Sequence, residues 1–160
     1  MASQCFLKLE GVKGESHDHA HQDAIEVISW RWGATNTGTM HIARRGGAGT
    51  SEFEDLTVTK RTDKATPALW EHLATGRTIS SGELIMRKGD GDPVEFLRIS
   101  IEQVLVTGIG ATGAEGGPHA SEEVRLNFAR WTLVYTPQEP DGTPGPEEEF
   151  GFDIARNERR

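Results

Sequence analysis

The sequence predicts a mainly β protein: a bulged antiparallel β-barrel with one short α-helix and a long glycine-rich extended loop. Apolar and polar residues alternate in several segments, which is the two-residue period of a half-buried strand. Glycine contributes 19 of the 160 residues, well above its usual share of roughly 7%, and this suits a chain with many turns. Two long strands also change the phase of their apolar residues, as strands do at the bends of a barrel.

The first two strands are predicted before residue 34. Apolar side chains occupy every second position from Cys5 to Leu9, and a polar loop spans residues 15–23. The second strand spans 24–33 and carries apolar residues on both faces, so we expect a protein neighbour on each side. One of these neighbours could be another subunit. The two faces are Ile28, Trp30 and Trp32 on one side, and Ile25, Val27, Ser29 and Arg31 on the other.

The one convincing helix is predicted at Thr66–Gly76. Thr66 can cap the free N–H groups of the first turn, and Pro67 lacks an N–H where none is needed. Gly76 suits a left-handed C-cap. A helix of about three turns cannot bury its own apolar stripe, so strands must cover it. The residues of that stripe are Leu69, Trp70 and Leu73.

Two long strands in the second half of the chain change face along their length. In the first, Leu97, Ile99 and Ile101 give way to Val104 and Val106; in the second, Val124, Leu126 and Phe128 give way to Trp131, Leu133 and Tyr135. We interpret each change as a β-bulge at a barrel corner. Residues 1–160 are expected to form one domain. Its exposed loops are predicted at about 35–51, 108–118 and 138–149.

Composition and charge exclude several classes of function. The formal net charge of −8 disfavours general binding to nucleic acid or to an anionic membrane. No apolar run reaches membrane-spanning length, and the single cysteine excludes an internal disulfide. No signal peptide is visible at the N-terminus. The protein is therefore expected to be made in the cytoplasm and to stay there at first.

The sharpest candidate for chemistry is the trio His17, His19 and His21. Alternate imidazoles on an extended segment would face the same way, but a metal site needs three or four ligands and usually a supporting shell. Because these histidines lie in a loop, we expect a polar turn and no metal or other cofactor. No nucleophile motif is recognisable, so no enzyme is expected. The alternative hypothesis is a monomeric β-barrel that binds a small ligand or a metal at this loop.

Segments spread along the whole chain closely resemble the Hcp family, the tube protein of type VI secretion systems. Their order and spacing carry the resemblance more than any single motif does. The segments are Phe6–Ser16, Trp30–Gly33, Gly38–His41, Asp55–Lys60, Asp63–Pro67, Val104–Thr107, Val124–Ala129 and Phe150–Ile154.

The resemblance implies a β-barrel subunit that forms hexameric rings. Such rings stack into a tube, which a contractile sheath expels from the cell beneath a spike protein, and small effector proteins can travel in the lumen. It also implies secretion without a signal peptide, and no catalytic residues. This chain carries Arg31 where many members have a small serine between the two tryptophans, which suggests a different cargo preference.

Two groups of residues are candidates for contacts. Arg31 and Ser29 are expected on the lumen wall of the ring, opposite the tryptophan face. The loop 35–51 is expected to form ring-stacking and subunit contacts, because its glycines make it costly to order without a partner. The candidate residues in this loop are Gly38, Thr39, Met40, His41, Ile42, Arg44, Arg45, Gly46, Gly47, Ala48 and Gly49.

Overall fold

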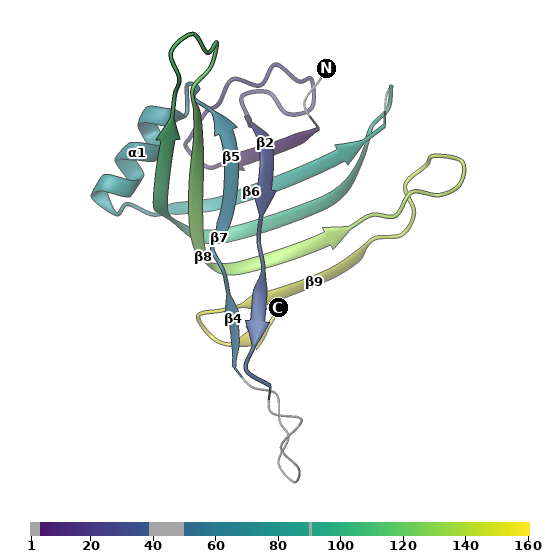
Figure 1. Cartoon of the computed structure of the whole chain (residues 1–160). Coiled ribbons are helices and arrows are strands. Elements are labelled where there is room, and N and C mark those ends of the chain that lie inside the picture. Colours follow the sequence, from purple (N-terminus) through teal and green to yellow (C-terminus); the bar gives the residue numbers. More distant parts are fainter. Residues whose placement is uncertain (1–3, 39–49, 90) are drawn as a thin grey trace.

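The computed structural model describes residues 4–38, 50–89 and 91–160 (Figure 1). The strands are β1 (Cys5–Leu9), β2 (Ile25–Arg31), β3 (Ala34–Asn36), β4 (Ser51–Phe53), β5 (Leu56–Arg61), β6 (Ile79–Lys88), β7 (Val94–Thr112), β8 (Ser121–Tyr135), β9 (Glu148–Asp153) and β10 (Glu158–Arg159), and the helix is α1 (Thr66–Thr75). No helix in these three ranges is long and apolar enough to cross a membrane.

Six antiparallel strands of the described chain close into a barrel. They follow the order β8-β5-β2-β1-β6-β7, and the pairing of β7 with β8 joins the two ends. Strands β9 and β10 extend the sheet beyond β8. The predicted mainly β barrel with one short helix is therefore confirmed. Its interior is filled by side chains that are almost wholly buried, among them Leu7, Ile25, Val58, Leu84, Val104 and Leu126.

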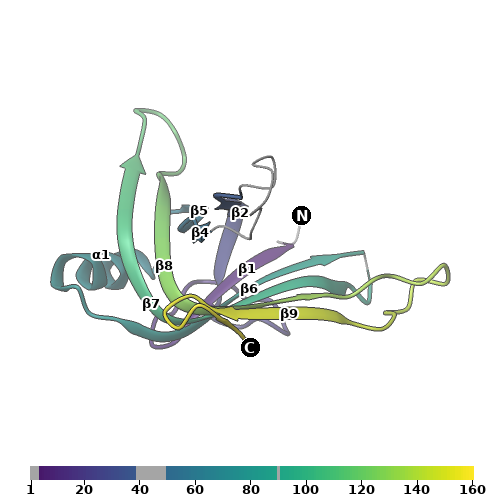
Figure 2. The same cartoon turned by 90° about the horizontal axis from the view of Figure 1, so that it is seen from below.

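The long strands β7 and β8 bend together, and the predicted change of face is present in both. The buried positions shift from Ile101 to Val104 in β7 and from Phe128 to Trp131 in β8. At this point β8 leaves its pairing with β5 and begins to pair with β9. Figure 2 shows both strands turning sharply out of the plane of β6 and β9.

The predicted bulge is not the cause of this change of face. The register between β7 and β8 is constant through the bend, and the shift in pairing lies further along, between Val106 and Gly108. Gln103 instead adopts a positive φ of 56°, a conformation that a non-glycine residue seldom takes. The left-handed residue Gln103 thus lies where the buried and exposed faces of β7 change places. The register of β7 against β8 is the same on both sides of it.

The loop bounds differ from those predicted. The segment 108–118 is not all loop, since β7 continues to Thr112 and the connection to β8 spans only 113–120. Gly108 and Gly110 belong to β7, and at Gly108 the side chain of Arg125 occupies the space that a Cβ would need. The ends of the segment 35–51 are likewise paired, as β3 and β4. The last connection spans 136–147, close to the prediction.

The helix is where it was predicted, but two details were wrong. Thr66 does not cap it: the N-cap is Ala65, and the Thr66 hydroxyl bonds instead to the Glu122 carboxylate at 2.6 Å. Trp70 is 42% exposed, and the buried face is formed by Leu69 and His72, with Leu73 partly buried. Gly76 has φ 68°, as the left-handed C-cap requires.

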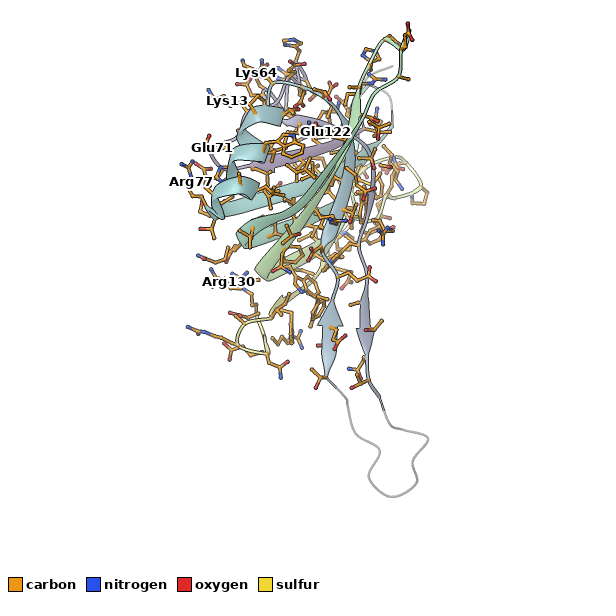
Figure 3. All side chains as sticks on the ribbon, turned by 60° about the vertical axis from the view of Figure 1, so that its left-hand side comes forward. Lys13, Lys64, Glu71, Arg77, Glu122 and Arg130 are labelled. Atoms are coloured by element: carbon orange, nitrogen blue, oxygen red, sulfur yellow. The ribbon has the colours of Figure 1, made fainter. Side chains whose placement is uncertain are left out.

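A buried ionic group connects the start of the helix to the barrel. Lys60 on β5 is fully buried, and its Nζ lies 2.5 Å from a carboxylate oxygen of Glu122 on β8 and 2.9 Å from one of Asp63. Thr66 donates to the same Glu122 oxygen. Figure 3 shows Glu122 on a strand to the side of the start of α1. Because a buried charge is costly unless it is paired, each member depends on the others.

This interdependence predicts the outcome of replacing one or both partners. Lys60→Met leaves the Glu122 carboxylate buried without its cation, which should lower the free energy of unfolding by about 3–5 kcal/mol. The double variant Lys60→Met with Glu122→Gln removes both charges and should recover most of that loss. Urea unfolding at one fixed protein concentration measures both changes. A cost below about 1 kcal/mol for Lys60→Met would contradict the assigned role.

Candidate functional site

The outer face of the β2–β5–β8 sheet carries the side chains that the sequence placed opposite the tryptophans. Ser29 and Arg31 are exposed on β2. Arg31 is paired with Thr57 on β5, and Thr57 with Arg125 on β8. Residues directly opposite one another in antiparallel strands share a face. Arg31 and Arg125 therefore flank Thr57 on one outer surface, which we call the arginine face.

Arg125 was not singled out from the sequence, although it alternates with the core residues Val124 and Leu126. Its guanidinium lies over the backbone of Gly108, where a Cβ would sit only 2.2 Å from a guanidinium nitrogen. A glycine is therefore needed on β7 for the arginine to lie flat in this position. The sequence signal would have been a glycine within a strand opposite an arginine, which suggests a close approach.

Arg31 is only loosely held. Its Nη1 lies 3.8 Å from a carboxylate oxygen of Glu54, and the side chains are 73% and 54% exposed. An ion pair this exposed contributes little, with a typical value of about 0–1 kcal/mol. The guanidinium can therefore exchange Glu54 for another anion at small cost, which makes Arg31 suited to contacting a partner.

The predicted division of β2 into two faces was partly wrong. A bulge between Val27 and Ser29 shifts its register against β5. As a result Ile28 is 57% exposed, and it does not share the inward face of Trp30. Trp30 packs against the core, and its Nε1 donates to the sulfur of Met86. The expected opposition of Trp30 and Arg31 is nevertheless present.

A two-stranded arm, formed by β3 and β4, extends away from the barrel (Figure 1). Its base is fixed by an aromatic cluster. Trp32 meets the ring of Trp131 edge-on at 5.0 Å, and Phe53 lies 5.5 Å from both Trp131 and Phe152. The Trp32 indole N–H also donates to the Glu54 carbonyl at 2.9 Å. The three residues of each arm strand are exposed or only partly buried, so the described part of the arm is anchored at its base.

Most of the candidate contact residues in the glycine-rich loop lie outside the described residues. This applies to Thr39, Met40, His41, Ile42, Arg44, Arg45, Gly46, Gly47, Ala48 and Gly49. Gly38 is described and exposed, at the end of the arm. The contact role of this loop therefore stays a prediction.

The three histidines are not brought together. His21 is buried, with its Nε2 at 2.7 Å from a carboxylate oxygen of Glu95 and its ring 4.7 Å from that of Phe6. His17 and His19 are exposed. Between them Asp18 pairs with Arg87, and hydrogen bonds from this arginine lower the pKa of Asp18 to about 2. Residues 17–21, which we call the clasp, are thus held to β6 by the Asp18–Arg87 ion pair and to β7 by the His21–Glu95 contact.

No group of three or more histidine, cysteine, aspartate or glutamate side chains in residues 4–38, 50–89 and 91–160 is placed to hold a metal ion. The thiol of Cys5 is buried, and burial raises its pKa to about 12. A thiol that stays protonated is a poor nucleophile. Among the described residues, neither the histidine segment nor the Cys5 thiol is therefore a candidate functional site. The arginine face and the arm are the candidates that stay.

Comparisons with known proteins agree with this geometry. The family described as "Type VI secretion system effector, Hcp" matches residues 6–135. "Protein hcp1" of Pseudomonas aeruginosa is 38% identical over 159 residues, with 98% of each chain covered. A solved structure of a type six secretion system protein has a TM-score of 0.93 at 30% identity, covering 99% of this chain and 100% of its own. For Hcp1 from Salmonella typhimurium the TM-score is 0.84 at 30% identity, with both chains covered completely.

The barrel, the arm and these likenesses define a protein of type VI secretion. The chain belongs to the Hcp family, whose members are structural proteins of secretion. The identification made from the sequence segments is therefore confirmed.

The clasp predicts how the protein responds to metal removal. Because Asp18 and His21 are already bonded to Arg87 and Glu95, they are not available as ligands. The purified protein should contain no stoichiometric metal, and an excess of chelator should leave the melting temperature unchanged. Elemental analysis and a thermal scan test this. A reproducible fall of several degrees with chelator would contradict it.

Proposed function

We propose that this chain is the structural subunit of the inner tube of a type VI secretion system. Six copies form a ring, rings stack into a tube, and a contractile sheath expels the tube beneath a spike protein. The protein is made in the cytoplasm and leaves the cell through this system. Small effector proteins travel in the lumen, and neither nucleic acid nor a membrane is a partner.

The observation that carries this proposal is the arm. A two-stranded ribbon is marginally stable in water by itself, and the described part of this one projects beyond the barrel and packs at its base against Trp131 and Phe152. A second copy of the chain would supply the surface that the arm lacks. Since the chain belongs to the Hcp family, we propose that this second copy is a neighbour in a stacked ring. No described feature favours the alternative of a ligand-binding monomer with a metal at the histidine loop.

The mass in solution tests the proposal directly. A hexameric ring is six times heavier than the 17.5 kDa chain, so light scattering after size exclusion separates it clearly from a monomer. Negative-stain images of the same fractions should show rings, and stacks of rings at higher protein concentration. A mass equal to one chain at every concentration would contradict the proposed function.

The arginine face is the part of the subunit that we assign to the lumen. In a ring, Arg31 and Arg125 of every copy would line a continuous positive belt in an otherwise acidic protein. Guanidinium groups bind carboxylates through paired, charge-assisted hydrogen bonds. Ser29 lies on the exposed side of the same strand and adds a neutral donor. The belt therefore favours effectors with an acidic surface, and salt should weaken their retention.

Arg31→Glu reverses the charge at the centre of this belt. Ring formation should be unaffected, because Arg31 is exposed and its contact with Glu54 is weak, while co-purification of effectors should fall strongly. Arg31→Lys is the matched control, which keeps the charge and should retain part of the cargo at low salt. Quantitative proteomics of purified rings measures the change. Undiminished cargo on intact Arg31→Glu rings would rule out the assignment.

The glycine-rich loop is proposed as the contact between stacked rings. Met40 and Ile42 would contribute on the order of 1.5–3 kcal/mol each if a neighbouring ring buried them. Shortening Gly38–Gly49 to a tight turn should leave the circular dichroism spectrum of the barrel nearly unchanged and should prevent tube formation and secretion. Normal tubes and normal export from the shortened protein would show that the loop has no such role.

A further inference from the structure

A β-bulge on β7 lies at one point of the arginine face. The pairing with β8 shifts between Val106, which is opposite Leu126, and Gly108, which is opposite Arg125, so Thr107 is the extra residue. Beyond their bend, β7 and β8 run side by side to the loop that joins them (Figure 2). A bulge re-aims the side chains around it and is often found next to a functional site. Here it places an exposed threonine beside a glycine.

Thr107 and Gly108 together form a seat for the side chain of Arg125. A Cβ at Gly108 would lie within 2.6 Å of Nη2, Nε and Cζ of Arg125, so the guanidinium occupies the place of the missing side chain. The Thr107 hydroxyl donates to a carboxylate oxygen of Asp55 at 2.5 Å and lies 3.3 Å from the Arg125 carbonyl. Asn127 donates to the other Asp55 oxygen at 2.8 Å. These bonds fix β7 and β8 to the residue that precedes β5.

The seated guanidinium is exposed and available to a partner. Within residues 4–38, 50–89 and 91–160, no hydrogen bond or ion pair joins it to another side chain. Arg31, two strands away across β5, is held only loosely by Glu54. The arginine face thus carries one guanidinium whose position is set by the neighbouring backbone and one that is loosely held.

We propose that Gly108 is a positioning residue for the recognition of acidic effectors. Because it leaves room for the guanidinium, it presets Arg125 as a carboxylate-binding group. An arginine that is already ordered loses less side-chain freedom on binding, and this ordering cost corresponds to about a two- to tenfold change in affinity. The inference rests on the proposed function and deepens it, since it names a residue that sets the preference of the lumen for acidic cargo.

Binding of a fluorescent oligoglutamate peptide to the full-length, assembled protein tests the positioning role. Gly108→Ala should weaken binding about two- to tenfold. Its methyl group displaces only the flexible end of the arginine side chain, so the barrel should stay intact. Gly110→Ala is the matched control: it changes the next glycine on the same face of β7, where a Cβ meets open space, and should bind as the wild type does. Fluorescence anisotropy at low salt measures each affinity.

A double-mutant cycle shows whether Gly108 acts through Arg125. Arg125→Ala should weaken peptide binding at least as much as Gly108→Ala does. Adding Gly108→Ala to Arg125→Ala should cause no further loss, because no guanidinium is left to displace. A glycine with a merely structural role would lower the affinity again. Circular dichroism and a thermal scan confirm that every variant is folded.

A second measurement needs neither a partner nor a ring. Phenylglyoxal modifies accessible arginines, and peptide mass mapping gives the rate at each of them. Gly108→Ala should raise the rate at Arg125 relative to that at Arg31, which serves as the exposed internal standard. Gly110→Ala should leave this ratio unchanged.

The outcomes separate this inference from the proposed function. Wild-type peptide affinity in Gly108→Ala, a further loss in the double variant, or an unchanged Arg125 rate would each overturn the positioning role and leave the ring itself standing. Wild-type rings that do not bind the peptide would overturn both the positioning role and the acidic preference of the arginine face. A wild-type protein that is monomeric at every concentration would overturn the tube, whereas a raised Arg125 rate in Gly108→Ala would still support the seat.

Discussion

The pairing of β7 with β8 is the constraint on which the rest of the structure depends. It closes the barrel, and it is maintained in one register through a bend at which both strands exchange their buried face. Before the bend β8 pairs with β5, and beyond it β8 pairs with β9. One strand thus serves both the barrel and the sheet extension formed by β9 and β10. The left-handed conformation of Gln103 lies at this junction.

The sequence predicted those features that depend on local periodicity. Alternation predicted the strands, and Gly76 predicted the end of the helix. It failed where tertiary contacts override local preference. Thr66 is a good capping residue, yet the buried Lys60–Glu122 pair draws its hydroxyl away from the helix. No local pattern reveals that pair, because its members are 62 residues apart.

The candidate site shows the same limit. Arg31 was found because it stands between two tryptophans, and its exposure agrees with period-two geometry. Arg125 was missed, because its importance depends on a strand pairing and on the open space above Gly108. The bulge after Val27 was also missed, and it is what leaves Ile28 exposed.

Together these features describe a barrel that carries the arginine face and the arm on its outside. The core is buried within one chain, whereas the described part of the arm is fixed at its aromatic base. The central claim is that a second copy orders the arm, and amide hydrogen exchange compared between isolated subunits and assembled protein tests it most directly. We expect barrel strands such as β1 and β5 to be equally protected in both, and the amides of β3 and β4 to become protected only on assembly. Arm amides that exchange equally fast before and after assembly would contradict the account.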